Sequence, residues 1–209
     1  MCDNRRMKPR LLLVLLALGV LAVTAGAGLA RLLEPAGVSL QAGTWLAQPR
    51  SLAEFHLQDL SGRDFDRSNL HGRPTLLFFG FTHCPDVCPT TLAMLAQLQR
   101  AHPLPGAQVV FVTVDPERDS AASLQVYLGY FDREFIGLRG DEAALAPLLR
   151  SLSAIAVRQN LPDGSYTMDH SATLYLIDSA GRLVAVFSPP FSASAIAADL
   201  KQLRTAHRV

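Results

Sequence analysis

The sequence predicts an α/β sandwich built on a mixed sheet, and two patterns indicate it. In the middle of the chain, short apolar runs typical of buried strands alternate with longer segments of helical period. At the front of the folded region and near its end, pairs of strand-like runs are joined by short turns. Strand–helix alternation favours parallel neighbours, whereas hairpins give antiparallel ones. The sheet should therefore contain both kinds of pairing.

The first part of the folded domain, which we expect to begin near Ser51, contains a hairpin, a buried strand and a helix. Residues 53–65 (AEFHLQDLSGRDF) predict a strand, a Ser-Gly turn and a second short strand. The continuous apolar run RPTLLFFGF, at 73–81, is typical of a strand buried on both faces. Residues 89–100 then have a helical period, and one face of that helix would carry Leu92, Leu95, Ala96 and Gln99.

The rest of the domain continues the alternation and ends in a helix. Asp119 and Ser120 are suited to cap a helix, because their side chains accept hydrogen bonds from its free N–H groups. Pro147 should bend a later helix, and the turn DSAG should join the last two strands. In order, we expect a strand at 107–115, a helix ending at Tyr130, a strand at 134–140, a helix at 141–152, strands at 154–160, 171–178 and 181–188, and a helix from Ser192 to Arg204.

The N-terminus predicts a membrane anchor. Residues 1–10 carry four positive charges, and residues 11–30 carry none. A helix of about 20 residues spans the roughly 30 Å hydrocarbon core, and the positive flank stays in the cytoplasm. We therefore expect a cytoplasmic segment at 1–10 and a transmembrane helix at 11–30. A cleaved signal peptide is the alternative, since Ala25-Gly26-Ala27 resembles a cleavage site. In both cases the domain is exported.

Residues 31–50 contain several prolines and glycines without a clear period, so they predict a linker to a domain at 51–209. The formal net charge of +1 and the 18% of charged residues argue against a nucleic-acid partner, which would require a basic face. Of three cysteines, Cys2 lies before the predicted anchor, so that only Cys84 and Cys88 belong to the exported domain. In an oxidising compartment such a pair can form a disulfide.

The segment CPDVCP, which contains Cys84 and Cys88, permits three interpretations: a structural disulfide, a redox pair or part of a metal site. A disulfide closing so short a loop would contribute only about 2 kcal/mol, so a purely structural role is disfavoured. Cys88 is expected to cap the helix that begins at Pro89, where the helix dipole would lower the thiol pKa. Three intervening residues span a metal ion more easily than a disulfide. The spacing favours a metal without excluding redox chemistry.

A metal site requires more ligands than two thiolates. Two sulfurs and one imidazole would form a soft, low-coordinate set of the kind that suits Cu(I). Among the six histidines, His170 stands apart because it precedes the apolar strand SATLYLID, at the edge of the expected sheet. His83 adjoins Cys84, but adjacent side chains in extended backbone point apart. Met168 is a soft donor, although filling the core is its ordinary role.

Four segments, FFGFTHCPDVCPTTL, FVTVDPERDS, FIGLRG and MDHSATLYLID, occur in this order. Over residues 51–204 the chain resembles the Sco/SenC family of membrane-anchored copper chaperones. The resemblance implies a thioredoxin-like fold and one copper ion per chain, as Cu(I) or Cu(II). The ligands that it implies are Cys84, Cys88 and His170. Asp86 and Asp115 match acidic positions near the family's site, or they are loop-capping residues.

The resemblance also implies a function and a location. The chain would deliver copper to, or prepare the thiols of, the CuA site of cytochrome c oxidase. Its partners would be the copper-site subunit of that oxidase and other copper carriers. The domain would face the periplasm, or the mitochondrial intermembrane space in a eukaryote. The alternative is a thiol–disulfide oxidoreductase in which Cys84 and Cys88 are the redox-active pair, so enzymatic activity stays open. A peroxiredoxin-like peroxidase fits the proline-flanked pair poorly.

Overall fold

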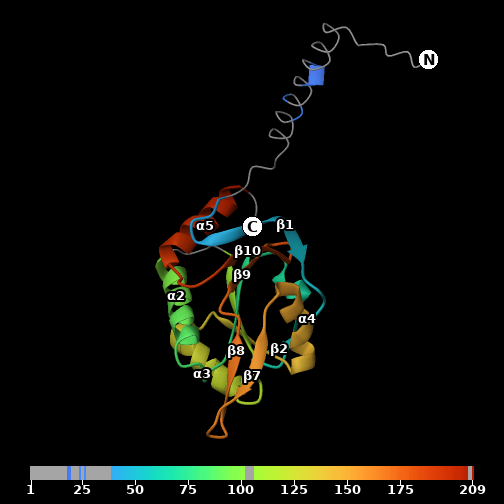
Figure 1. The fold of residues 1–209 in the computed structure, drawn as a ribbon. Coiled ribbons are helices and arrows are strands. Elements are labelled where there is room, and N and C mark those ends of the chain that lie inside the picture. The colour runs from blue at the N-terminus through green and yellow to red at the C-terminus, as the bar shows by residue number, and fades with distance from the viewer. Residues whose placement is uncertain (1–17, 20–23, 25, 27–38, 102–105, 207–208) are drawn as a thin grey trace, which may run out of the picture. The chain divides into compact units, whose positions relative to one another are not determined.

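The computed structural model describes residues 18, 19, 24, 26, 39–101, 106–206 and 209 (Figure 1). The chain divides into two units, Met1–Gly37 and Val38–Val209, and the fold below is that of the second. Most of the predicted anchor at 11–30, and all of residues 1–10, lie outside the described residues. Among the residues that are described, no helix has both the length and the apolar character needed to cross a membrane.

The second unit is a mixed α/β fold, as predicted, with a central sheet of eight strands. The strand order is β1-β10-β9-β4-β5-β6-β2-β3. The β4–β5 and β5–β6 pairs are parallel, and the other pairs are antiparallel. The strands are β1 (Gly43–Ser51), β2 (His56–Asp59), β3 (Asp64–Asp66), β4 (Thr75–Gly80), β5 (Gln108–Thr113), β6 (Ile136–Arg139), β9 (Leu174–Ile177) and β10 (Arg182–Phe187).

Helices cover both faces of this sheet. Figure 1 shows α2 and α5 on one side and α4 on the other. The helices are α2 (Val87–Ala101), α3 (Ala121–Phe131), α4 (Glu142–Leu152) and α5 (Ala193–Thr205), and a short 3-10 helix, η1 (Arg67–Leu70), follows β3. Ser120 caps α3, since its side chain accepts a hydrogen bond from the N–H of Ser123. The predicted cap is thereby confirmed for Ser120, whereas Asp119 has a different role, described below.

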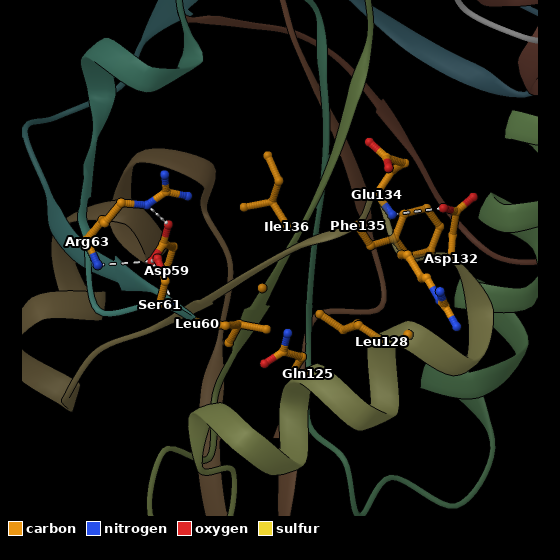
Figure 2. Close-up of a pocket in the computed structure, with 13 residues that line it drawn as sticks. Asp59, Leu60, Ser61, Arg63, Gln125, Leu128, Asp132, Glu134, Phe135 and Ile136 are labelled. Carbon is orange, nitrogen blue, oxygen red and sulfur yellow. Dashed lines mark hydrogen bonds and ion pairs between the residues drawn. The ribbon is translucent and has the colours of Figure 1, made fainter.

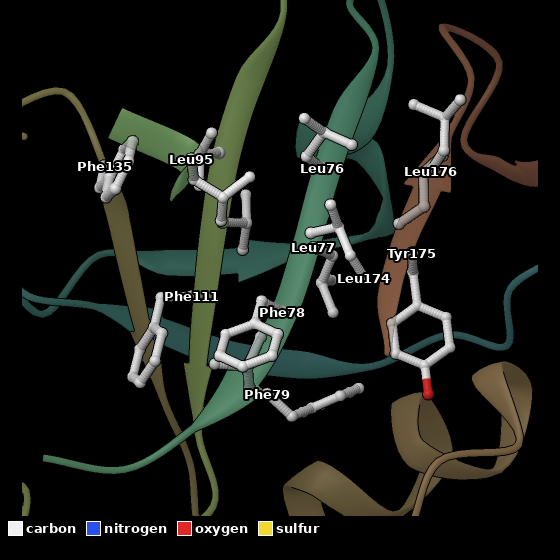
Figure 3. Packing of buried hydrophobic residues seen from close by; sticks show 14 of the residues in the cluster. Leu76, Leu77, Phe78, Phe79, Leu95, Phe111, Phe135, Leu174, Tyr175 and Leu176 are labelled. Atoms are coloured by element: carbon white, nitrogen blue, oxygen red, sulfur yellow. The ribbon is translucent and has the colours of Figure 1, made fainter. Parts of the chain in front are cut away.

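The centre of the sheet is the core that positions the site. All six residues of β4 are buried, as are all six of β5, which confirms the prediction from the continuous apolar runs. Phe78 is paired in register with Phe111, and their ring centroids are 6.2 Å apart. Figure 3 shows these rings packed among leucines of β4 and β9. Because burying each large apolar side chain is worth about 1.5–3 kcal/mol, this region forms a rigid base for the loop after β4.

The predicted linker is wrong in its second half. β1 spans Gly43–Ser51 and pairs with β10 at the edge of the sheet. The sequence pattern missed it because Pro49 and the absence of alternation argue against a strand. An edge strand tolerates proline, and the β1–β10 register is interrupted between Trp45 and Arg50.

Only the first strand of the β7–β8 hairpin was predicted from the sequence. β7 (Ala156–Asn160) pairs antiparallel with β8 (Tyr166–His170), and the two strands form a separate two-stranded sheet. Residues 154–160 were expected to be a strand, but the β8 segment was not. Its sequence is YTMDH, which is polar and too short for a clear alternation. His170 is therefore the last residue of β8, not the edge of the β9 strand.

Candidate metal centre

Three side chains from three elements meet at the end of β4. Cys84 lies in the loop between β4 and α2, Cys88 is the second residue of α2, and His170 ends β8. One ligand atom from each, the two sulfurs and an imidazole nitrogen, lie within 4.8 Å of one another. The Cys88 Sγ atom is 3.3 Å from His170 Nε2, across 82 residues of sequence. The structure thus brings together the three residues that the sequence nominated.

The loop that carries Cys84 is held by its own hydrogen bonds. The N–H of Cys84 donates to the carbonyl of Phe81 at 3.3 Å, and the N–H of Cys88 donates to Cys84 Sγ at 3.4 Å. The helix begins at Val87, so Cys88 is in its first turn and is not the cap that we predicted. Pro89 still lies in that first turn, where its missing N–H removes no intrahelical bond.

Asp86 precedes the helix and serves its first turn. Its side chain accepts a hydrogen bond from Thr90 Oγ1 at 3.3 Å, and its carbonyl accepts one from the N–H of Thr90. These contacts support the interpretation of Asp86 as a loop-capping residue.

Cys88 is fully buried, while Cys84 is half-buried, and both are free cysteines. Burial raises the pKa of the Cys88 thiol, and its contact with Cys84 raises it further. The expectation that the helix dipole would lower this pKa is therefore wrong. Desolvation dominates because the sulfur points into the core. Without a metal, Cys88 is a protonated thiol near neutral pH, and metal binding must displace its proton.

The His170 imidazole makes edge-on contacts with two phenylalanine rings. The centroids of Phe78 and Phe81 lie 6.1 Å and 5.7 Å from that of the imidazole. Nδ1 is 3.2 Å from the carbonyl oxygen of Ser171. Because a carbonyl only accepts, Nδ1 carries the hydrogen and Nε2 presents its lone pair to Cys88. Burial lowers the pKa of His170, which favours the neutral imidazole that metal ions require.

Two buried carboxylates near the site have partners of their own. Asp115 accepts hydrogen bonds from Arg118 Nε and from the Tyr166 hydroxyl. Asp119 accepts from the N–H and hydroxyl of Thr82 and from the hydroxyl of Thr113. Both are therefore structural in this arrangement. The sequence nominated Asp115 but not its partners Tyr166 and Arg118, and it did not predict that Asp119 is buried. Only the folding of β8 and the loops brings these groups together.

Within the part of the chain that the structure describes, no other histidine joins the group formed by Cys84, Cys88 and His170. Met168 is partly buried against the core, as its ordinary role predicted. His83 is exposed, and its Nδ1 is 2.9 Å from Thr82 Oγ1. His56 lies in β2, and His71 forms an isolated bridge with Ala180. His102 and His207 are outside the described residues.

A cavity of about 710 Å³ lies away from these three residues, between the β2–β3 turn, the end of α3 and β6 (Figure 2). Arg63 Nε donates to Asp59 at 2.8 Å, and the N–H of Glu134 donates to Asp132 at 2.9 Å. Several polar groups that line the cavity are therefore hydrogen-bonded to one another. None of the three clustered residues lines it, so size alone does not locate the chemistry of this protein.

Comparison with known proteins agrees with this geometry. The family model described as SCO1/SenC matches residues 46–205. The mitochondrial SCO2 homolog of Bos taurus is 36% identical over 160 residues, which cover 74% of this chain and 60% of the bovine protein. The match thus spans about three fifths of that relative's length.

Two solved structures illustrate the likeness of fold. Bradyrhizobium japonicum ScoI with copper bound has a TM-score of 0.66 and 42% identity, covering 73% of this chain and 98% of that one. BsSco, a member of the Sco family of cytochrome c oxidase assembly proteins, has a TM-score of 0.60 and 21% identity, covering 80% and 98%. At that lower identity the likeness concerns the fold alone. The mixed α/β fold predicted from the pattern of strands and helices is confirmed.

Proposed function

This chain belongs to the SCO1/SenC family, and on that premise we propose that it is a copper-binding assembly factor. It holds one copper ion, as Cu(I) or Cu(II), between Cys84, Cys88 and His170. The observation that carries the proposal is the convergence of two sulfurs and a neutral imidazole nitrogen within 4.8 Å. Copper is the cargo of this protein.

The donor set suits copper. Two sulfurs bound to one metal at about 2.3 Å would lie about 4 Å apart, so the three atoms need only a small contraction to share an ion. Thiolate and imidazole are soft or intermediate donors, and three of them favour Cu(I). The copper-bound ScoI structure, at 42% identity, supports this choice of metal.

The unequal exposure of the two cysteines suggests how cargo leaves. Cys84 is half-buried and Cys88 is fully buried, so an acceptor thiolate reaches the metal from the Cys84 side. Copper would pass by stepwise exchange of ligands, with Cys88 released last. The acceptor is the copper-site subunit of cytochrome c oxidase, and other copper carriers supply the ion. Membership of the SCO1/SenC family, from whose resemblance this partner was expected, supports the assignment.

Residues 11–30 would anchor the protein, with the domain facing the periplasm or the mitochondrial intermembrane space. The apolar, uncharged composition of that segment and the positive charges before it support this location.

The test is a Cu(I) titration of the reduced protein without oxygen, in competition with a chromophoric Cu(I) chelator. We expect one equivalent of copper for the wild type. His170→Ala should weaken binding by at least about tenfold, since one of three ligands is lost. His56→Ala, in β2, is the matched control and should bind as the wild type does. A wild-type protein that binds no copper would refute the proposal.

A second candidate is thiol–disulfide exchange, favoured by the asymmetry of the two free thiols. Cys84 would attack a partner disulfide and release one partner thiol. Cys88 would then attack the mixed disulfide, release the second thiol and leave a Cys84–Cys88 disulfide. Two electrons pass from the dithiol to the partner. His170 is not needed, so reductase activity that survives in His170→Ala would assign this role separately.

A further inference from the structure

The hairpin that carries His170 is not part of the main sheet. β7 and β8 pair only with each other, in a register that runs from Ala156 opposite His170 to Asn160 opposite Tyr166. A two-stranded hairpin is marginally stable by itself in water. Contacts between this hairpin and the body of the domain must therefore fix the position of His170.

One face of β8 makes those contacts. Alternate residues of a strand share a face, so Tyr166, Met168 and His170 point the same way. Met168 packs against the core, and His170 meets the sulfur of Cys88. Tyr166 lies four residues, about 13 Å, along the strand from His170. The hairpin is thus held at both ends of this face.

The contact at Tyr166 is a closed set of hydrogen bonds, which we call the Tyr166 latch: Asp115, Arg118 and Tyr166. The Tyr166 hydroxyl donates to one oxygen of Asp115 at 2.9 Å, and Arg118 Nε donates to the other. Arg118 Nη1 then donates to the backbone carbonyl of Tyr166 at 3.0 Å. Asp115 is only 3% exposed, so the carboxylate that accepts two of these bonds is shielded from competing water.

Stacking reinforces the latch and extends it toward the metal centre. The Arg118 guanidinium carbon is 3.8 Å from the centroid of the Tyr166 ring and 5.7 Å from that of Phe81. Phe81 is in edge contact with His170. The Arg158 guanidinium carbon lies 3.6 Å from the Tyr166 ring centroid, and Arg158 also pairs with Glu117. Both side chains of this ion pair are exposed, so the pair contributes little to stability.

We propose that Tyr166 is a positioning residue: the Tyr166 latch holds the β7–β8 hairpin against the loop after β5, and so keeps His170 beside the two sulfurs. Without the latch the hairpin would visit displaced positions. The apparent affinity for copper would then equal the intrinsic affinity multiplied by the fraction of time that His170 is in place. The effect on copper rests on the proposed function, whereas the effect on the hairpin does not.

The first experiment is amide hydrogen exchange on the reduced, metal-free protein. Tyr166→Phe removes the hydroxyl and keeps the ring, so its stacking is retained. Exchange should accelerate in 156–160 and 166–170 and stay unchanged in β4 and β5. Arg118→Lys keeps the charge but loses the forked donor, and it should give the same local effect. Tyr130→Phe is the matched control, because Tyr130 is 86% exposed on α3. Unchanged hairpin exchange in Tyr166→Phe, or an equal rise in the core strands, would overturn the proposal.

The second experiment measures Cu(I) affinity for wild type, Tyr166→Phe, His170→Ala and the double variant. Tyr166→Phe should weaken binding about tenfold, which corresponds to about 1.4 kcal/mol. In the His170→Ala background the same change should have no effect, because Tyr166 acts through His170. An equal loss in both backgrounds would mean that Tyr166 affects the fold alone, and the proposal would fail. If the wild type binds no copper, the proposed function fails, while the exchange experiment still decides whether the latch exists.

Discussion

At the scale of single residues, the packing around the candidate metal centre depends on one glycine. Gly80 ends β4, and a Cβ atom there would lie 2.7 Å from the Phe111 ring and 2.9 Å from Cys88 Sγ. Both neighbours are fully buried and cannot retreat into solvent. Hydrogen is therefore the only side chain that leaves room for the buried thiol.

We expect Gly80→Ala to lower the free energy of unfolding by about 1–3 kcal/mol, because the added methyl overpacks a closed core. Urea denaturation of the reduced protein measures this change. Gly129→Ala is the control, since a Cβ at that position in α3 meets nothing within 4 Å. It should be neutral or slightly stabilising. Equal stability of the two variants would contradict the packing argument.

Asp59, which lines the cavity of Figure 2, contributes to the stability of the fold by an amount that depends on pH. Burial alone would raise the pKa of its carboxyl, but hydrogen bonds from Ser61 and Arg63 outweigh burial and hold the pKa at about 2, below the ordinary 3.8. A carboxyl with a lowered pKa stabilises the fold above its ordinary pKa. That contribution is lost as pH falls from about 3.8 through about 2.

Asp59→Asn should therefore destabilise the protein by about 1 kcal/mol at pH 7, a figure reduced for solvent screening at the surface. The difference from wild type should shrink as pH falls below 3.8 and vanish near 2. Unfolding curves of both proteins across this range provide the measurement. A difference that is constant with pH would show that the carboxylate's charge contributes nothing.

At the scale of elements, the loop between β4 and α2 is tied to the sheet by one carboxylate. Asp119 is fully buried, and its oxygens accept from the N–H of Thr82 at 3.1 Å and from the hydroxyls of Thr82 and Thr113. Thr82 is two residues before Cys84. The carboxylate thus joins the end of β5 to the loop that carries Cys84.

Asp119→Asn should lower the free energy of unfolding by about 2 kcal/mol, because an amide turns one acceptor atom into a donor that faces other donors. Amide exchange should accelerate at Thr82. The exposed Asp64 of β3 offers a control, and Asp64→Asn should change stability by less than about 0.5 kcal/mol. If Asp119→Asn were as stable as this control, the carboxylate would not be what holds the loop.

Elements with strong local signals were predicted from sequence, and those without were not. Continuous apolar runs located β4 and β5, and the serine before α3 located its cap. The start of α2 was placed two residues late, at Pro89, because proline marked the first turn without marking its first residue. β8 was missed because its inward residues, Tyr166, Met168 and His170, do not form an apolar set.

At the scale of the whole molecule, the N-terminal edge of the sheet is fastened to the C-terminal helix. Asp199 of α5 is fully buried and accepts hydrogen bonds from the N–H groups that lead into β1. These donors are Gln41 at 2.7 Å, Ala42 at 2.8 Å and Gly43 at 3.0 Å. A segment that the sequence assigned to a linker is thereby part of the folded domain.

Asp199→Ala should cost about 2–3 kcal/mol of stability, because several N–H groups lose a charged acceptor. Amide exchange should accelerate along β1, and a version of the protein that begins at Ser51 should be less stable than one that begins at Val38. Thermal unfolding of these proteins tests both expectations. Equal stability of the two lengths would restore the interpretation of Gly43–Arg50 as a linker.

Local patterns in the sequence were enough to specify the central strands, the helices and the cysteine pair, because apolar period, caps and spacing are recorded within a few neighbouring residues. From spacing alone, His170 was one candidate among six histidines, and the order of the family's motifs selected it. That Nε2 faces Cys88, that burial raises the Cys88 pKa and that Tyr166 holds the hairpin were decided only by tertiary structure. These properties depend on contacts across 48–82 residues, which no local pattern encodes.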